Sequence, residues 1–299
     1  MTAISQSNQA PAFKLRFNLG KLLTFLLLAS IAALFLVPFF WMISTSLKSP
    51  FELQGIVWLP ERLAFENYEA AFSFGMWPEW FANTTIITVL GVIGTVISAS
   101  LVAYSFARLR WRARDTLFSL ILATMMLPSV VTMIPQFVLF AKLPAFGIQN
   151  SAVWVNTFLP LIVPAWCGGG AFNIFLLRQF MRTIPMELSE AARIDGASEL
   201  RIWWNIVLPL TKPALATVAI FTFQGAWQDF MGPLLYLQSE RLYTLQIGLR
   251  QFEAAAGGSP AYNWLMAASL VVMLPVLAVY LVFQRYFIEG IQLSGMGGR

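Results

Sequence analysis

Long apolar stretches, separated by shorter polar segments, run along almost the whole chain. Asp229 is the only Asp, Glu, Lys or Arg within the six longest of them. Each reaches roughly the 20 residues that a helix needs to cross a ~30 Å hydrocarbon core. They cover approximately Leu22–Trp41, Phe81–Phe106, Leu117–Phe140, Val153–Leu177, Pro213–Leu237 and Trp264–Phe283. Because the alternating strands of a membrane barrel are only ~10 residues long, the pattern predicts an all-α membrane protein with six transmembrane helices.

The composition supports the same class of protein. Hydrophobic residues make up 58% of the 299 residues and charged residues 11%, whereas a soluble domain carries roughly 25% charged residues. A signal peptide would be shorter than the first stretch and would end at a small-residue cleavage site, so we expect this stretch to be a retained helix. The basic residues lie in short clusters beside apolar stretches, which membrane topology explains more economically than nucleic-acid binding does.

The distribution of Lys and Arg predicts the orientation, because these residues concentrate in cytoplasmic loops. If the N-terminus lies inside, 14 basic residues fall on the cytoplasmic side and five fall outside. We therefore expect a cytoplasmic tail at 1–21, a six-helix transmembrane domain at 22–287 and a second cytoplasmic tail at 288–299. The segment from Lys48 to Trp80 is long enough to fold back on the outer membrane surface.

The predicted inner loop at about 185–210 carries strong helix signals. Pro185 suits a first helical turn and Gly196 suits the position just past a helix end, with good helix formers between them. This spacing predicts a helix of about eleven residues, a sharp reversal at Gly196 and a second helix capped by Ser198. A short cytoplasmic helix with small residues could dock into a groove on another protein. From the residues alone, it could equally be a surface helix that only links two spans.

Several motifs at fixed spacing give this loop a family resemblance. They are Glu190-Ala191-Ala192, Asp195-Gly196-Ala197 and Ile206-Val207-Leu208-Pro209. This pattern resembles the signature loop of binding-protein-dependent ABC importer permeases. Similarity to the carbohydrate-uptake branch, closest to the smaller maltose- and glycerol-phosphate-type permease, extends through Trp227–Phe230, Pro233-Leu234, Tyr243–Leu245, Tyr262–Ala267 and Gln284–Gly290.

The resemblance implies a concrete assembly in a bacterial or archaeal cytoplasmic (inner) membrane. In such importers two permeases, normally different in this branch, form the pore, an ATPase dimer binds their inner faces and an extracytoplasmic solute-binding protein delivers the solute. The implied ATPase-coupling residues are Glu190, Ala191, Ala192, Asp195, Gly196, Ala197, Leu208 and Pro209. The tail from Ile288 would contact the ATPase, and Gln251–Ala261 would reach into the binding protein. The chain itself would be non-catalytic and bind no cofactor, with ATP and Mg held by the partner ATPase.

Four residues are candidates for a gate or solute path within the membrane: Asp229, Trp227, Gln224 and Asn173. An intramembrane carboxylate is a functional-site hypothesis by default. Because Asp229 lies late in its span, gating, hydrogen bonding between helices or structural capping is favoured over direct contact with the solute. Amide side chains suit a sugar-like solute and interhelical hydrogen bonds alike. Gly168-Gly169-Gly170 predicts a kink or close packing, because no G-x-x-x-x-G-K-[ST] phosphate loop occurs in the chain.

Other functions fit less well. A stand-alone secondary transporter usually shows inverted repeats and broken spans at matching positions, which we do not detect. An intramembrane enzyme would need a nucleophile with an evident base, and the chain has no histidine and one cysteine, Cys167. No metal site is expected. An importer for glycerol phosphate, a polyol or another solute stays open, because the residues that line the solute path are not identifiable from the sequence.

Overall fold

The computed structural model describes residues 19–73, 75–255 and 262–295, and these ranges contain helices and no strand. The predicted all-α class is therefore confirmed. Four helices are long and apolar enough to cross a membrane, or up to six if each of two bent pairs is one span. The elements are α1 Leu19–Ser46, η1 Pro50–Gln54, α2 Glu66–Ser73, α3 Trp77–Arg108, α4 Arg114–Thr124, α5 Ser129–Phe140, η2 Ile148–Asn150, α6 Leu159–Ile162, η3 Val163–Trp166, α7 Ala171–Thr183, α8 Glu187–Ile194, α9 Glu199–Ile202, η4 Trp203–Val207, α10 Leu208–Leu210, α11 Lys212–Trp227, α12 Met231–Tyr236, η5 Glu240–Leu242, α13 Leu245–Ala255 and α14 Tyr262–Gly295.

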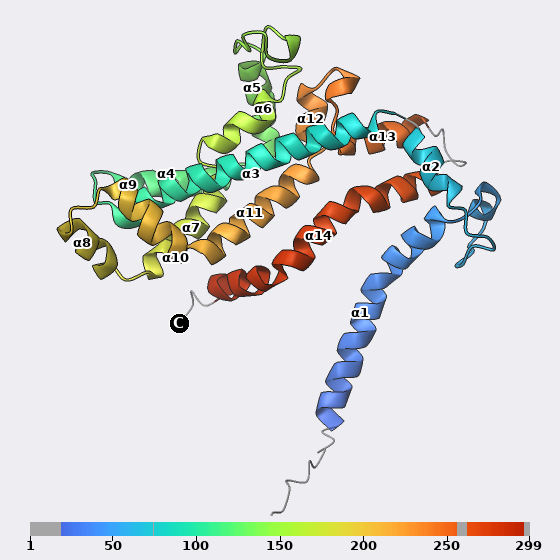
Figure 1. Cartoon of the computed structure of the whole chain (residues 1–299), viewed down its shortest axis with the longest axis horizontal. Coiled ribbons are helices and arrows are strands. Elements are labelled where there is room, and N and C mark those ends of the chain that lie inside the picture. Colours follow the sequence, from blue (N-terminus) through green and yellow to red (C-terminus); the bar gives the residue numbers. More distant parts are fainter. Residues whose placement is uncertain (1–18, 74, 256–261, 296–299) are drawn as a thin grey trace, which may run out of the picture.

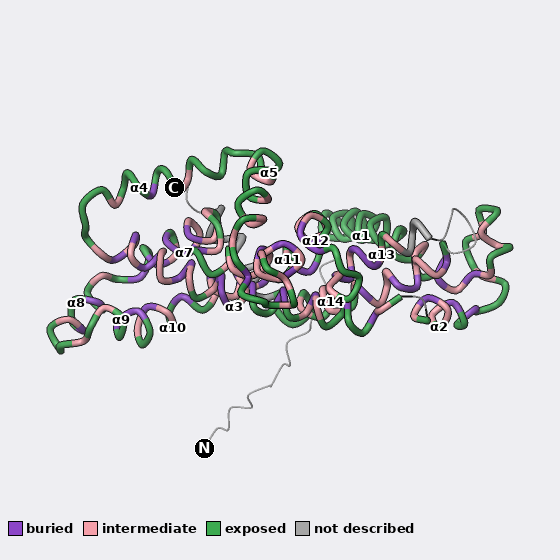
Figure 2. Tube along the Cα trace, turned by 90° about the horizontal axis from the view of Figure 1, so that it is seen from above, coloured by how far each residue is buried: buried purple, intermediate pink, exposed green. Residues whose placement is uncertain are grey.

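The centre of the bundle is α3, which packs against both α7 and α11. Small residues let these helices approach closely, and Ala99 and Ala103 of α3 are fully buried. Leu177 of α7 and Val218 of α11 complete this core. Figure 2 shows the buried positions running along these central helices. A second buried cluster, around Trp80, lies at the other end of α3.

Helix α1 stands apart from the bundle. It meets the rest of the molecule at its C-terminal end and projects away from it (Figure 1). Its most apolar window has no buried residue within the chain, and its side chains are hydrophobic on all sides. A helix that is apolar all round needs lipid or another protein around it.

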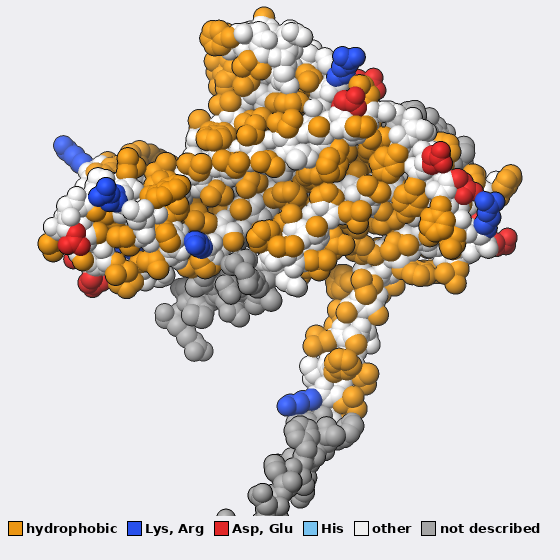
Figure 3. Space-filling model, viewed as in Figure 1, with side chains coloured by type: hydrophobic (Ala, Val, Ile, Leu, Met, Phe, Trp, Pro, Cys, Tyr) orange, Lys and Arg blue, Asp and Glu red, His pale blue; other side chains and the backbone are white. Residues whose placement is uncertain are grey.

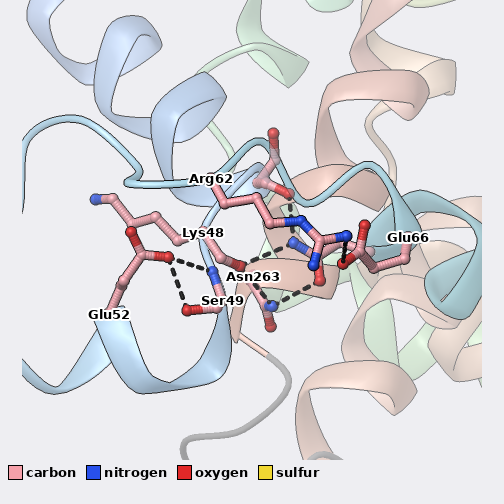
Figure 4. A network of polar contacts seen from close by, with 8 residues as sticks. Lys48, Ser49, Glu52, Arg62, Glu66 and Asn263 are labelled. Carbon is pink, nitrogen blue, oxygen red and sulfur yellow. Dashed lines mark hydrogen bonds and ion pairs between the residues drawn. The ribbon is translucent and has the colours of Figure 1, made fainter.

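The junction between α1 and α14 is held by buried amides (Figure 4). Asn67 of α2 donates from Nδ2 to the carbonyl oxygens of Ser46 and Lys48, both at 2.9 Å. Asn263 of α14 donates to the Lys48 carbonyl at 3.0 Å and to Asn67 Oδ1 at 2.9 Å. Amides from α2 and α14 thereby satisfy carbonyls at the end of α1 and just after it, where helical bonding ends.

Loops predicted to lie on the same side of the membrane meet at the same end of the bundle. At one end, Arg108 of α3 donates to the carbonyl of Ile184, just before α8. At the other end, Trp80 and Asn83 donate to the carbonyls of Glu240 and Arg241. Charged side chains lie toward the ends of the molecule and the middle of the visible face is hydrophobic (Figure 3).

Three of the six predicted spans are not continuous helices. The third bends by 100° between α4 and α5, where Pro128 restricts the preceding residue to extended backbone. The fourth starts at Leu159, not at Val153, and is interrupted at Cys167–Gly170. The kink predicted at Gly168–Gly170 is therefore confirmed, whereas the bend in the third span and the later start of the fourth were missed, because hydropathy treats an apolar stretch as uniform.

The fifth and sixth spans also differ from the prediction. Helix α11 ends at Trp227, and the short α12 follows as a separate helix. On its other side, α11 meets the helical segment Glu199–Leu210 at a bend of 82°. Helix α14 continues to Gly295, beyond the predicted end at Phe283 and into the predicted tail. The predicted binding-protein loop at 251–261 starts within α13, and its residues 256–261 lie outside the described residues.

Candidate coupling site

Helix α8 ends in a tight turn centred on Gly196. The N–H of Gly196 donates to the Arg193 carbonyl at 3.0 Å, and the N–H of Ala197 donates to the Ala192 carbonyl at 2.9 Å. These two bonds form a Schellman motif, which requires a left-handed residue after the helix. Gly196 supplies it with a φ of +79°. The predicted reversal at Gly196 is therefore confirmed.

The start of the helix differs from the prediction. Helix α8 has eight residues and its N-cap is Met186, so Pro185 precedes the helix and does not form its first turn. The helical hydrogen bonding begins with the Glu190 N–H, which donates to the Met186 carbonyl at 3.1 Å. The chain before it is extended at Ile184, with ψ of 132°, as expected for a residue before proline. Ser198 is the N-cap of α9, but its side chain makes no capping hydrogen bond.

The outward surface of this turn is open and partly apolar. Glu190, Ala191, Asp195 and Gly196 are exposed, whereas Ala192 lies on the buried side of α8 and Ala197 is half-buried. No atom lies within 4 Å of the point that a Gly196 Cβ would occupy. A partner backbone could therefore approach this turn closely.

Exposed hydrophobic side chains surround the turn, and the sequence reasoning missed them. Ile194 is 87% exposed, and Leu188, Leu200 and Trp204 are exposed beside it. Large exposed apolar patches rimmed by polar residues are typical of interaction sites, so these side chains are candidates for contact with a partner. The available signal was the placement of Leu188 and Ile194 on a short helix with charged residues.

Leu208 and Pro209 lie beyond the turn, in the one-turn helix α10. Leu208 is half-buried and Pro209 is exposed. The chain reaches them through the π-helical turn Trp203–Val207. Thr211 then donates to the Val207 carbonyl at 2.6 Å, next to the 82° bend into α11. These two residues therefore connect the exposed turn to a membrane helix.

The turn is braced by an ion pair across it. Arg193 Nε donates to Glu199 Oε1 at 2.7 Å, which joins the last turn of α8 to the first turn of α9. This hydrogen bond raises the pKa of the Arg193 guanidinium. The pair is partly exposed, so its contribution to stability is modest, and its main effect is to fix the two helices relative to each other.

The four membrane-embedded candidates do not converge on one described cavity. Gln224 alone of them lines a cavity of about 210 Å³, between α1, α11 and α14, with Phe223, Leu277 and Tyr280 among its other lining residues. Trp227 is buried and donates from Nε1 to the Val272 carbonyl at 3.0 Å. Its contacts bind α11 to α14.

The side chains of Asn173 and Asp229 both form hydrogen bonds with nearby backbone groups. Asn173 Nδ2 donates to the Gly169 carbonyl at 2.6 Å, which gives this carbonyl a hydrogen-bond partner in the helix break before α7. Asp229 lies between α11 and α12, not inside a helix as predicted, and Oδ1 accepts the Gly232 N–H at 3.1 Å. Within the described residues, no group of three or more His, Cys, Asp or Glu could hold a metal ion.

The described structure is a bundle of apolar helices with the exposed helices α8 and α9 at one end. The length and composition of these helices are those of a helical membrane protein. The chain belongs to the family of binding-protein-dependent transport system inner membrane components, whose sequence pattern matches residues 95–292. The matched region runs from the middle of α3 into α14 and includes the whole candidate coupling site. The protein is therefore a permease subunit of an ABC importer in the inner membrane.

Relatives from several organisms align over nearly the whole chain. The arabinooligosaccharides transport system permease protein AraQ of Halalkalibacterium halodurans is 33% identical over 275 residues, covering 90% of this chain and 94% of AraQ. The melibiose/raffinose/stachyose import permease protein MelC of Bacillus subtilis is 32% identical over 276 residues, covering 91% and 95%. A solved bacterial ABC transporter for import of the acidic polysaccharide alginate matches with a TM-score of 0.75 and 27% identity, covering 93% of this chain and 100% of the solved chain.

Proposed function

We propose that this permease imports an oligosaccharide or related sugar and that its Glu187–Leu210 segment couples the pore to a separate ATPase subunit. The open, partly apolar turn at Gly196 is the observation that carries the coupling role. Relatives named for arabinooligosaccharides, for melibiose, raffinose and stachyose, and for alginate support the solute class. Glycerol phosphate or a polyol is the competing solute class.

The proposed contacts use both the shape and the charge of the turn. The bare backbone at Gly196 and the small side chains of Ala191 and Ala197 permit close approach. Glu190 and Asp195 are exposed acids, and neither forms an ion pair within 4 Å in the described part of the chain. They would accept hydrogen bonds from donors on the ATPase, while Ile194 would bury apolar surface in its groove.

The proposed mechanism is a rigid-body switch between two packings of the pore. The partner ATPase binds ATP and Mg and performs the hydrolysis, since this chain contains no phosphate loop. Closure of the ATPase dimer would pull α8, and Leu208-Pro209 would pass the movement into α11. This permease would form half of the pore beside a second, different permease, with no cofactor of its own. Both termini would lie in the cytoplasm.

A binding protein outside the membrane would deliver the solute. Support comes from a solved bacterial alginate ABC transporter in complex with an alginate pentasaccharide-bound periplasmic protein, which shares the fold with a TM-score of 0.63. Stimulation of ATP hydrolysis in the reconstituted importer tests the solute class. Oligosaccharides presented on the cognate binding protein should stimulate it, and stimulation by glycerol phosphate alone would overturn the sugar assignment.

The coupling role is tested by co-purifying the ATPase subunit with tagged permease. Gly196→Arg should abolish co-purification, because a long side chain would occupy the docking space. Glu190→Ala should weaken it about ten- to hundredfold if a charged hydrogen bond of about 1.5–3 kcal/mol is lost. Gly196→Asn tolerates the left-handed backbone, so it separates backbone strain from the docking clash. Glu69→Ala, an exposed acid on α2 at the other end of the bundle, is the matched control. Undiminished ATPase binding by both Gly196→Arg and Glu190→Ala would contradict the proposal.

A further inference from the structure

The C-terminal end of α3 holds the coupling site at two separate points. Arg108, the last residue of α3, is 4% exposed. Its Nη2 donates to the Ile184 carbonyl at 2.8 Å and its Nη1 donates to the Pro185 carbonyl at 3.3 Å. The guanidinium therefore holds the chain immediately before α8 by two hydrogen bonds.

The second point of attachment lies after the Gly196 turn. Tyr104, one turn earlier on α3, is 4% exposed and donates from its hydroxyl to Glu199 Oε2 at 2.6 Å. The other oxygen of Glu199 accepts the bond from Arg193. One carboxylate therefore joins α3, α8 and α9. A hydrogen bond to a charged acceptor is stronger than one between neutral groups. A movement of α8 and α9 can therefore be passed to α3 through this contact.

These contacts matter because α3 is not a chain neighbour of the coupling site. Tyr104 and Glu199 are 95 positions apart. The direct chain routes are interrupted: the path through α7 contains the break at Cys167–Gly170, and the path into α11 contains the 82° bend. Helix α3 is continuous over 32 residues, from Trp77 to Arg108.

The opposite end of α3 is tied to the segment 240–245. Trp80 Nε1 donates to the Glu240 carbonyl at 3.0 Å, and Asn83 Nδ2 donates to the carbonyls of Arg241 and Tyr243 at 2.7 and 3.0 Å. Thr84 Oγ1 accepts the Leu245 N–H at 2.9 Å. A single unbroken helix thus links the coupling site to the loop at the other end of the bundle. Coupling over such distances travels through rigid elements of this kind.

We propose that Tyr104, Arg108 and Glu199 are positioning residues that clamp the coupling site to α3, so that α3 carries the ATPase movement to the loop at 238–245. This inference rests on the proposed coupling function. Tyr104 and Glu199 form the contact that a conservative change can remove, because Phe keeps the aromatic ring within the core. Arg108 serves both attachment and packing, so it is less suited to a clean test.

The test measures movement at the far loop without requiring a known solute. Gln238 is exposed, so Gln238→Cys in a Cys167→Ser background gives a single reporter for maleimide labelling. The permease is assembled with its ATPase, second permease and binding protein in liposomes. Labelling rates are compared without nucleotide and with Mg-ATP and vanadate. We expect a change of about fivefold in this parent, at the low end of coupling between two sites.

Tyr104→Phe should reduce the nucleotide-dependent change at least to half while the ATPase still co-purifies. Glu199→Gln, which keeps the side-chain size, should act in the same direction, and the two together should add little to either alone. Tyr68→Phe removes a comparable hydroxyl contact, to Ser46 at 2.9 Å, and should leave the change intact. A full change in both Tyr104→Phe and Glu199→Gln overturns the clamp, and so does a parent whose far loop does not respond to nucleotide. Failure of the coupling function itself would appear differently, as ATPase binding that is insensitive to Gly196→Arg.

Discussion

Asp229 illustrates how a single residue can carry either function or structure. Its carboxylate accepts the Gly232 N–H at the start of α12, in the manner of a helix N-cap. We predict that Asp229→Ala destabilises the permease by about 1 kcal/mol, the usual cost of losing such a cap. Asp229→Asn keeps an acceptor and should retain both stability and uptake. Tryptophan fluorescence during thermal unfolding and solute uptake measure the two properties. Loss of uptake in a stable Asp229→Asn protein would instead support a gating role for the charge.

Glu52 should make the segment after α1 sensitive to acid. Its carboxylate accepts hydrogen bonds from the Glu61 N–H and from Ser49 N and Oγ, all at 2.7 Å. The bond from Glu61 is the main cause that lowers the pKa of Glu52. A lowered folded-state pKa means that the stabilisation is present above the unfolded value of about 4.3. It is lost as the pH falls through the lower folded value.

Hydrogen exchange of the Ser49 and Glu61 amides, corrected for the intrinsic pH dependence of exchange, measures this effect. Protection should be steady from neutral pH down to about the unfolded Glu pKa of 4.3 and should decline below it. Glu52→Gln should show weaker protection at neutral pH and no such decline. The same acid-induced loss in Glu52→Gln would show that another group is responsible.

Close packing between helices predicts opposite effects for two glycines of α3. A Cβ on Gly94 would lie 2.5 Å from Trp166 Cδ1 and Nε1, at the end of η3, whereas a Cβ on Gly91 would meet nothing within 4 Å. Gly91→Ala should therefore be neutral or stabilising, by up to about 1 kcal/mol, because Ala favours helix over Gly. Gly94→Ala should be destabilising by about 1–3 kcal/mol, the usual range for overpacking.

The pair is compared by thermal unfolding of the purified permease. Gly94→Ala should have the lower unfolding temperature, and Trp166→Leu should rescue it partly by removing the indole ring. Equal unfolding temperatures for Gly91→Ala and Gly94→Ala would show that η3 moves aside without cost. That result would mean that the contact between α3 and the interrupted fourth span is loose.

Hydropathy predicted where the apolar helices lie but not where they bend. An apolar stretch reads the same whether it is straight or interrupted, so the 100° bend before α5 was missed although Pro128 marks it. The break at Cys167–Gly170 was predicted as a kink, but the residue of another helix that bonds to it was not predicted. Ser98 of α3 donates to the Ala165 carbonyl and accepts the Gly168 N–H. Such pairing between distant helices leaves no periodic signal in the sequence.

The candidate site was predictable to the extent that it depends on local backbone chemistry. Gly196 at the end of a run of helix formers predicted the turn that the structure contains. The exposure of Ile194 and the contacts of Tyr104 depend on how α3 and α8 pack, which no local pattern specifies. Trp227 had no signal that separated a solute contact from a buried contact between helices, because an indole serves both.

At the scale of the whole molecule, the ends of the bundle differ in chemistry. The end with α8 and α9 gathers arginines from several segments, including Arg108, Arg178 and Arg193, whereas the end with α2 carries Glu52, Glu66 and Glu69. This asymmetry follows the rule that Lys and Arg stay on the cytoplasmic side. The rule therefore predicts that the candidate coupling site lies on the cytoplasmic side, where ATP is available, as the proposed function requires.

This orientation can be tested with one cysteine at each end of the permease. Cys167 is exposed, so it is first replaced by Ser. Ile56 and Ile194 are 84% and 87% exposed. The variants Ile56→Cys and Ile194→Cys are made separately. The permease is expressed without its ATPase, because the ATPase would cover Ile194. In intact cells with a permeabilised outer barrier, a membrane-impermeant maleimide should label Ile56→Cys only. Ile194→Cys should react after the inner membrane is opened. The reverse pattern would put the Gly196 turn outside the cell, where no ATPase could dock, and would remove the physical basis of the coupling proposal and of the α3 clamp together.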